Sequence, residues 1–417
     1  MKEKTACNTD SAIEGILLKM ERIKQGKGQK EVCYGICVPS YLSKIEHGTV
    51  CPEKGIMAQL FEKLGIYYEE DEKNLSRFKK LIEEYYYCMH YNLDTQSVYN
   101  KLKAEENVLC YSRYAIDWLL IEGFEKKQAE PLLKKLEAHM ERKQRAYYQI
   151  LTYIQMKNND TDERVRLCKE AYEVLHNSFA LSALCEAYFM QGNYTAIHAL
   201  EQRFVTTAVE EGNTARLADC FFLNGSAYAC LDMEDMMMVY YERCIRLLQN
   251  TGWKESLATM YYNIGASLIG LKKYDDALYY LDKAGDSDNA GNPADAELEP
   301  YIMHKKALIY LRMGQKEEGK KFLKKYKEAV FGMEGASVLE RLQYQEAEME
   351  YEDGFLDKPE YLEVLEKLIK EIDREEHFGY LYFYRELIIE TYKRQRQYKK
   401  ALEFEQKISK KITKHVI

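Results

Sequence analysis

Apolar residues recur at intervals of three and four along most of the chain, and short polar breaks separate the segments that carry them. Such breaks occur at residues 191–193, 270–273 and 313–315. This spacing places apolar side chains on one face of a helix. Only six prolines occur in 417 residues, so long helices can run without interruption. The pattern predicts an all-α protein.

Beyond residue 100, one position recurs about every 40 residues and holds an aromatic residue or leucine. Several copies carry a small residue three positions earlier, which lets two helices approach closely. The recurring residues are Tyr148, Tyr188, Tyr228, Leu268, Tyr310, Tyr351 and Tyr392, and the small ones are Cys185, Gly225, Gly265 and Ala307. The spacing predicts an array of about seven helix pairs over residues 108–417.

The clearest repeat runs from Tyr261 to Ala284 and contains Asn263-x-Gly265, a turn and a second apolar helix. It resembles the tetratricopeptide repeat (TPR), with a period longer than the standard unit of about 34 residues. Longer helices account for the difference, and HEAT-like pairs of similar length are the alternative. The resemblance implies a right-handed superhelix whose concave wall binds extended peptides or partner proteins.

Shorter apolar-periodic segments lie near the N-terminus, at about 12–25, 29–35, 39–46 and 53–64. Gly35 lies near the turn between the second and third segments, Pro39 suits a first helical turn, and Gly48 suits a helix end. Short helices joined by a tight turn are typical of helix-turn-helix DNA-binding domains. We therefore expect three parts: a helix-turn-helix domain at 1–66, a linker helix at 67–107 and a repeat domain at 108–417.

The N-terminal segment resembles the repressor-like (XRE-type) helix-turn-helix domain of bacterial and phage regulators. The matching residues are Arg22, Gln29, residues 31–33, residues 40–46, Gly48 and Pro52. In that family the residues matching Arg22 and Glu46 form a structural ion pair, and the residue matching Gln29 begins the second helix and contacts DNA. The spacing of Gln29 and Glu46 is most similar to the PlcR branch of peptide-responsive regulators, which also includes Rgg, PrgX and NprR. The PlcR branch joins such a domain to a TPR array.

The resemblance implies that the third helix lies in the major groove of DNA. The candidate DNA-binding residues are Gln29, Ser40, Tyr41, Ser43 and Lys44. Serine hydroxyls and the lysine ammonium suit base edges or phosphates, and a tyrosine ring suits a thymine methyl group. Val38 and Pro39 stand where relatives carry polar or basic residues, which shifts recognition toward DNA shape and phosphates.

The distribution of charge agrees with this placement of the DNA contact. Residues 1–66 hold ten Lys and Arg against eight Asp and Glu, whereas residues 67–417 hold 50 against 60. The acidic body repels a polyanion, so nucleic-acid contact is expected only at the slightly basic N-terminal domain.

Asn263 is the strongest candidate for binding a peptide in the repeat domain. By resemblance to peptide-binding TPR grooves, it faces inward and its amide pairs with one peptide unit. The further candidates are Asn224, Tyr262, Tyr301, His304 and Lys305. A lysine or histidine on this wall suits a peptide carboxylate. Packing between helices is the alternative for these residues and for most of the 36 tyrosines.

No motif for catalysis or metal binding is found in the sequence. The eight histidines are isolated, and Leu271 stands where a phosphate-binding loop requires lysine. Cys33 and Cys37 match positions at which the family buries small apolar residues. We expect no enzymatic activity, no metal and no cofactor.

Together these features predict a cytoplasmic, homodimeric transcription regulator of a quorum-sensing type. It would bind a double-stranded DNA operator and respond to a short signalling peptide in its TPR groove. Residues 1–20 lack the apolar core of a secretory signal, and no segment is long and apolar enough for a membrane span. The alternatives are a TPR scaffold that sequesters a partner, with a vestigial helix-turn-helix, and a phosphatase acting on a response regulator.

Overall fold

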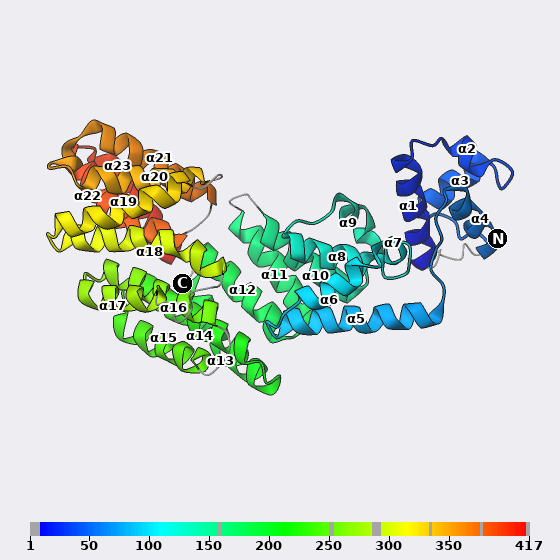
Figure 1. Cartoon of the computed structure of the whole chain (residues 1–417), viewed down its shortest axis with the longest axis horizontal. Coiled ribbons are helices and arrows are strands. Elements are labelled where there is room, and N and C mark those ends of the chain that lie inside the picture. Colours follow the sequence, from blue (N-terminus) through cyan, green and yellow to red (C-terminus); the bar gives the residue numbers. More distant parts are fainter. Residues whose placement is uncertain are drawn as a thin grey trace. The chain divides into compact units, whose positions relative to one another are not determined.

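The chain is all-α, as the sequence predicts. The computed structural model describes residues 9–156, 160–249, 254–285, 293–332, 336–375 and 378–413. Helices account for most of these residues, and the described segments contain no strand (Figure 1). No helix in the described segments is long and apolar enough to cross a membrane.

The chain divides into two units by its internal contacts. One unit comprises the chain up to Met156 together with Arg166–Ala180. The other comprises the chain from Leu181 onward and the short segment before Arg166. This division falls at neither residue 66 nor residue 107, the boundaries expected from the sequence.

The first unit begins with four helices that share a core. They are α1 (Thr9–Lys24), α2 (Gln29–Cys33), α3 (Pro39–Glu46) and α4 (Lys54–Lys63). Leu18, Val32, Leu42 and Phe61 meet in this core. Gly35 has a φ of +80° in the turn between α2 and α3, a conformation that glycine adopts without steric cost.

Helix α1 also has a second apolar face, which packs against later helices of the same unit. Ile13 and Leu17 lie in one cluster with Ile116 and Leu136. Those residues belong to α8 (Ala115–Lys126) and α9 (Pro131–Leu136), which is followed by the 3₁₀ turn η1 (Glu137–His139). The four N-terminal helices are therefore joined to the rest of the first unit through a shared apolar core.

Residues 67–107, expected to form a linker helix, also contribute to the core of the first unit. They include α5 (Glu72–His90) and α6 (Gln96–Lys103), which are followed by α7 (Glu106–Leu109). Phe78 and Tyr85 on α5 are buried in one cluster with Trp118 on α8. Because its apolar face is covered in this way, the segment is packed structure and not a free connector.

Longer helices follow in consecutive pairs. They are α10 (Arg142–Gln155), α11 (Thr161–Leu175), α12 (Ser178–Gln191), α13 (Tyr194–Glu210), α14 (Thr214–Cys230), α15 (Glu234–Leu248), α16 (Lys254–Gly270), α17 (Tyr274–Ala284), α18 (Pro293–Arg312), α19 (Lys316–Gly332), α20 (Val338–Glu350), α21 (Pro359–Glu375), α22 (Phe378–Arg394) and α23 (Tyr398–Thr413), with the 3₁₀ turn η3 (Phe355–Asp357) before α21. The pairs of the second unit are visible in Figure 1 in green to red.

The small residues of the repeat hold paired helices close together. A Cβ atom added to Gly225 would lie 2.6 Å from Cδ1 of Tyr241, and one added to Gly265 would lie 2.8 Å from Cγ of Leu281. These distances are shorter than van der Waals contact, so α14 and α16 can approach α15 and α17 this closely only with glycine at those positions.

Candidate functional site

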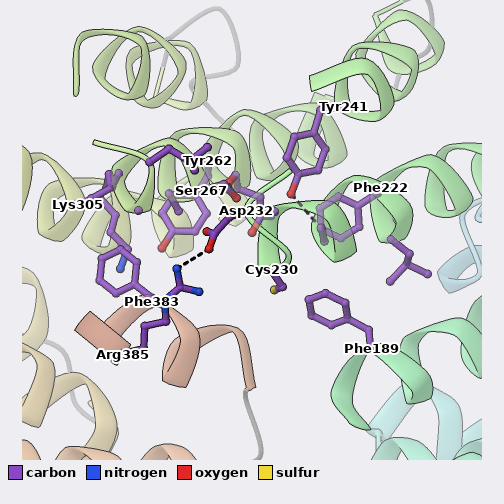
Figure 2. A pocket seen from close by; sticks show the side chains of 18 of the residues that line it. Phe189, Phe222, Cys230, Asp232, Tyr241, Tyr262, Ser267, Lys305, Phe383 and Arg385 are labelled. Carbon is purple, nitrogen blue, oxygen red and sulfur yellow. Dashed lines mark hydrogen bonds and ion pairs between the residues drawn. The ribbon is translucent and has the colours of Figure 1, made fainter. Parts of the chain in front are cut away.

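A cavity of about 790 Å³ lies in the second unit (Figure 2). The first helices of successive pairs, α12, α14, α16 and α18, line it, and α22 completes the wall. Aromatic rings supply much of the lining, including Phe189, Phe222, Tyr262 and Phe383. The volume is typical of pockets that bind small ligands.

Three positions of each repeat supply much of this wall. They lie five residues before, two residues before and two residues after the recurring aromatic or leucine. The first position gives Leu223, Asn263, Lys305 and Leu387; the second gives Glu186, Ser226, Ala266 and Glu390; the third gives Met190, Cys230, Gly270 and Arg312. Spacings of three, four and seven bring these side chains to one helix face.

Most charged side chains of the pocket are already paired. A guanidinium nitrogen of Arg216 lies 2.8 Å from a carboxylate oxygen of Asp219. The corresponding nitrogen–oxygen distances are 2.7 Å between Arg385 and Asp232 and 3.5 Å between Lys272 and Glu386. Arg385 and Glu386 belong to α22, and their partners lie in the turns after α14 and α16. Figure 2 marks the pair of Arg385 and Asp232 with a dashed line. Glu390 pairs with Arg394 on its own helix.

Lys305 and Arg312 are different, because no hydrogen bond or ion pair engages either cation within the described segments. Lys305 is 2% exposed, and its Nζ lies 3.6 Å from the ring centroid of Phe383. Arg312, two turns further along α18, is exposed, and its Cζ lies 5.9 Å from the same centroid. Burial, followed by the nearby charge of Arg312, lowers the pKa of Lys305 to about 7.

Two buried carboxyl groups on α20 oppose this effect on Lys305. The charges of Glu346 and Glu350 raise the pKa of Lys305. Burial, followed by the charge of Glu350, raises the pKa of Glu346 well above its usual range. The hydroxyl of Tyr361 donates a 2.8 Å hydrogen bond to Glu346, yet one oxygen of each carboxyl group accepts none among the described residues.

Three of the six predicted peptide-binding residues, Tyr262, Asn263 and Lys305, line the cavity. The amide nitrogen of Asn263 donates to the carbonyl oxygen of Thr259 at 2.8 Å, which fixes the side chain and leaves its amide oxygen as an acceptor.

Asn224, Tyr301 and His304 lie outside the lining, so the structure does not support placing them in the site. Asn224 is 1% exposed; its Oδ1 lies 2.7 Å from Nδ1 of His198, and its amide nitrogen donates to the carbonyl oxygen of Cys220. His304 is also buried and stacks on Tyr326, while Tyr301 donates to Glu340. Asn224 and His304 each stand one residue from the lining position, and one residue rotates a side chain by about 100° around the helix.

Arg312, Phe383 and the pair of Asp232 with Arg385 were not predicted. The repeat register contains a signal for Arg312, because it stands two residues after Tyr310, as Met190, Cys230 and Gly270 stand after their own recurring residues. Phe383 and Arg385 come to the pocket from α22, far along the chain, and local periodicity contains no signal for that contact.

The predicted DNA-binding residues lie on and beside α3 in the first unit. Ser40 and Lys44 are exposed one turn apart, and Ser43 is half-buried. Tyr41 is half-buried and packs on the core of the four N-terminal helices. Gln29 is the first residue of α2, and its amide nitrogen donates to Glu46 at 2.8 Å. That bond leaves the amide oxygen of Gln29 for other contacts.

Arg22 and Glu46 form a bidentate ion pair between α1 and α3. The guanidinium donates to the two carboxylate oxygens at 2.6 and 2.9 Å, and hydrogen bonding to Glu46 raises the pKa of Arg22. Close packing reinforces this pair, since a Cβ atom added to Gly15 would lie 2.1 Å from the carbonyl oxygen of Ile45.

Comparison with solved structures identifies the architecture. The structure described as Rap protein complexed with competence and sporulation factor aligns with a TM-score of 0.58 and 12% identity, over 82% of this chain and 99% of that chain. The apo form of the quorum sensor NprR from B. thuringiensis aligns with a TM-score of 0.56 and 14% identity, over 81% and 99%. The chain has a TPR-like helical-repeat fold.

A third similar structure is aspartyl phosphate phosphatase F from Bacillus subtilis, with a TM-score of 0.50, 16% identity and coverage of 80% of this chain and 93% of that chain. No protein-family model matches the sequence, and no curated protein matches it. At these identities the likeness concerns the fold alone.

Proposed function

We propose that this protein is a cytoplasmic transcription regulator whose binding to a double-stranded DNA operator is controlled by a short signalling peptide. The observation that carries the proposal is the open pocket lined by consecutive repeats, with Asn263 on its wall. The fold supports it, since one similar structure contains competence and sporulation factor and another is called a quorum sensor.

The pocket suits a peptide because it offers both kinds of contact that an extended chain needs. Aromatic rings such as Phe222 and Tyr262 provide apolar area. The fixed amide of Asn263 presents an oxygen that can accept from a peptide N–H. Such a contact holds a ligand backbone without reading its side chains.

The N-terminal helices support the DNA-binding part of the proposal. Ser40 and Lys44 are exposed on the same face of α3. The ion pair of Arg22 and Glu46 holds that helix against α1. The acidic balance of residues 67–417 restricts phosphate contact to this part of the chain. A homodimer would present two such helices to a two-fold-symmetric operator.

Two other functions are compatible with the fold. A scaffold that sequesters a partner protein needs only the repeat surface, and the similar structure called aspartyl phosphate phosphatase F favours a role in phosphate signalling. We favour the regulator, acting by binding and not as an enzyme, because neither alternative uses the exposed face of α3.

The test is selection of genomic DNA fragments by the full-length protein at two salt concentrations. We expect a discrete, roughly palindromic site whose affinity falls steeply with salt, because phosphate contacts release counterions. Lys44→Glu should abolish this binding by placing an anion beside the DNA backbone. Lys324→Glu, at an exposed lysine on α19, is the matched control and should bind like the wild type.

Equal DNA binding by the two variants would contradict the role of α3. Loss of peptide binding in Lys44→Glu, measured on the same preparation, would show that the variant acts through folding and would also contradict it.

A further inference from the structure

One end of the pocket carries two cations that face a single aromatic ring. Lys305 and Arg312 stand seven residues apart on α18, and seven residues are close to two helical turns. The Nζ of Lys305 and the Cζ of Arg312 both lie within 6 Å of the Phe383 centroid. Figure 2 shows Lys305 beside Phe383.

The surrounding charges do not satisfy these cations. On α22, Arg385 and Glu386 are paired with Asp232 and Lys272, respectively. On α20, the buried carboxyls of Glu346 and Glu350 raise the pKa of Lys305, but neither forms an ion pair with it among the described residues, and Glu346 accepts a hydrogen bond from Tyr361. In the described part of the chain no carboxylate lies within ion-pair distance of Lys305 or Arg312, although both side chains line the open cavity.

A buried ammonium without a hydrogen-bonded partner is unfavourable, and proteins normally pair such a group. Its position at a cavity wall allows a ligand to supply the missing anion. We propose that Lys305 and Arg312 bind a carboxylate of the peptide ligand, while Phe383 packs against the apolar part beside it. This inference rests on the peptide-binding part of the proposed function and specifies the chemistry of that ligand.

This carboxylate anchor, formed by Lys305 and Arg312, makes the affinity for the peptide depend on pH. Burial and Arg312 lower the pKa of Lys305, whereas the carboxyls of Glu346 and Glu350 raise it. The neighbouring His304 is itself buried, and its pKa is lowered well below the usual range by burial and by the charge of Lys305. A bound carboxylate favours the charged lysine, so binding takes up a proton and affinity falls as the pH rises above 7.

The experiment uses two pools of synthetic heptapeptides with the same random composition. One pool has free C-terminal carboxylates, and the other is amidated. Peptides retained by the full-length protein in gel filtration are identified by mass spectrometry, and the affinity of the most enriched peptide is then measured from pH 6 to 9.

Four variants are compared with the wild type. Lys305→Met and Arg312→Gln remove the cations of the anchor. The controls are Lys325→Met and Arg341→Gln, which remove exposed cations that lie 5.8 Å from Phe322 and Phe331 outside the pocket. Each anchor variant therefore has a control with the same chemical change at a cation beside an aromatic ring.

We expect the wild type to retain carboxylate-bearing peptides and each anchor variant to bind them about tenfold more weakly, the effect of losing one charge-assisted contact. Enrichment confined to the free-acid pool would identify the C-terminal carboxylate, and enrichment of Asp or Glu in both pools would identify an acidic side chain. The affinity of the wild type should decline above pH 7, and that of Lys305→Met should change less.

Retention of peptides without any preference for a carboxylate, with all four variants alike, would overturn the anchor and leave peptide binding in place. Retention of no peptide by the wild type would overturn both the anchor and the proposed peptide-binding function.

Discussion

Two buried charges in this molecule differ in how they are satisfied. Glu46 is 1% exposed and receives hydrogen bonds from Arg22 and Gln29, all from side chains of the N-terminal helices. Lys305 is 2% exposed and forms no hydrogen bond or ion pair with the described residues, but it borders a cavity.

The difference separates a charge that supports the fold from a charge that is available to a ligand. Burying an ion costs free energy unless it is paired and hydrogen-bonded, and Glu46 meets that condition within the chain. Lys305 forms no such pair among the described residues, and an anion that enters the pocket would supply it. A buried charge therefore indicates a binding site when its missing partner can come from an accessible cavity.

Among these variants, Arg22→Ala should change the stability of the protein most. It leaves the Glu46 carboxylate buried with only Gln29 as partner, which should lower the free energy of unfolding of the first unit by about 3 kcal/mol. Urea unfolding followed by circular dichroism measures the change. Arg77→Ala removes an exposed ion pair with Glu105 in the same unit, and should cost less than about 1 kcal/mol.

The shared core of α1 couples the N-terminal helices to α8 and α9. Because Ile13 and Leu17 pack with residues of α8 and α9, the N-terminal helices should lose protease resistance together with those helices. Equal unfolding midpoints for Arg22→Ala and Arg77→Ala would show that the Glu46 carboxylate does not depend on its partner.

A smaller effect of opposite sign is expected from Lys305→Met. Replacing an unpaired buried ammonium by an apolar side chain of similar shape should raise the free energy of unfolding by about 1 kcal/mol at pH 6. Arg385→Gln, which breaks an exposed pair in the same pocket, serves as the control and should lower that free energy by less than about 1 kcal/mol.

The advantage of Lys305→Met should disappear above pH 7 and then reverse, because a slope of up to about 1.4 kcal/mol per pH unit offsets about 1 kcal/mol within one unit. The pKa of this lysine falls from 10.5 to about 7 on folding. Between these values the unfolded chain binds more protons, so the wild type gains stability as the pH rises, at up to about 1.4 kcal/mol per pH unit. A stability difference between wild type and Lys305→Met that does not change from pH 6 to 10 would mean that folding does not lower the pKa of Lys305.

The repeat architecture could be predicted from the sequence because each helix pair repeats one local rule. The small residues at Gly225 and Gly265 let the paired helices approach closely. The same repeat positions supply much of the lining of the cavity. Lys305 stands at the same repeat position as Asn263, but His304 and Asn224 are each rotated about 100° away from the wall.

The organisation of the first unit could not be predicted in the same way. Helix α1 has two apolar faces, with Leu18 in one core and Ile13 in another. A sequence shows that such a face exists but not which later segment covers it. For the same reason α5 was expected to be a linker, and the contribution of Phe383 from α22 could not be foreseen.

We propose that a ligand in the pocket controls DNA contact. The deciding measurement is the affinity of the full-length protein for its selected DNA site. The affinity should be measured with and without the most enriched peptide at fixed salt. We predict a change of about tenfold or more, corresponding to a coupling free energy of about 1.4 kcal/mol. The change should be lost in Lys305→Met at a peptide concentration that saturates only the wild type. An unchanged affinity for DNA, with the peptide demonstrably bound, would contradict the claim.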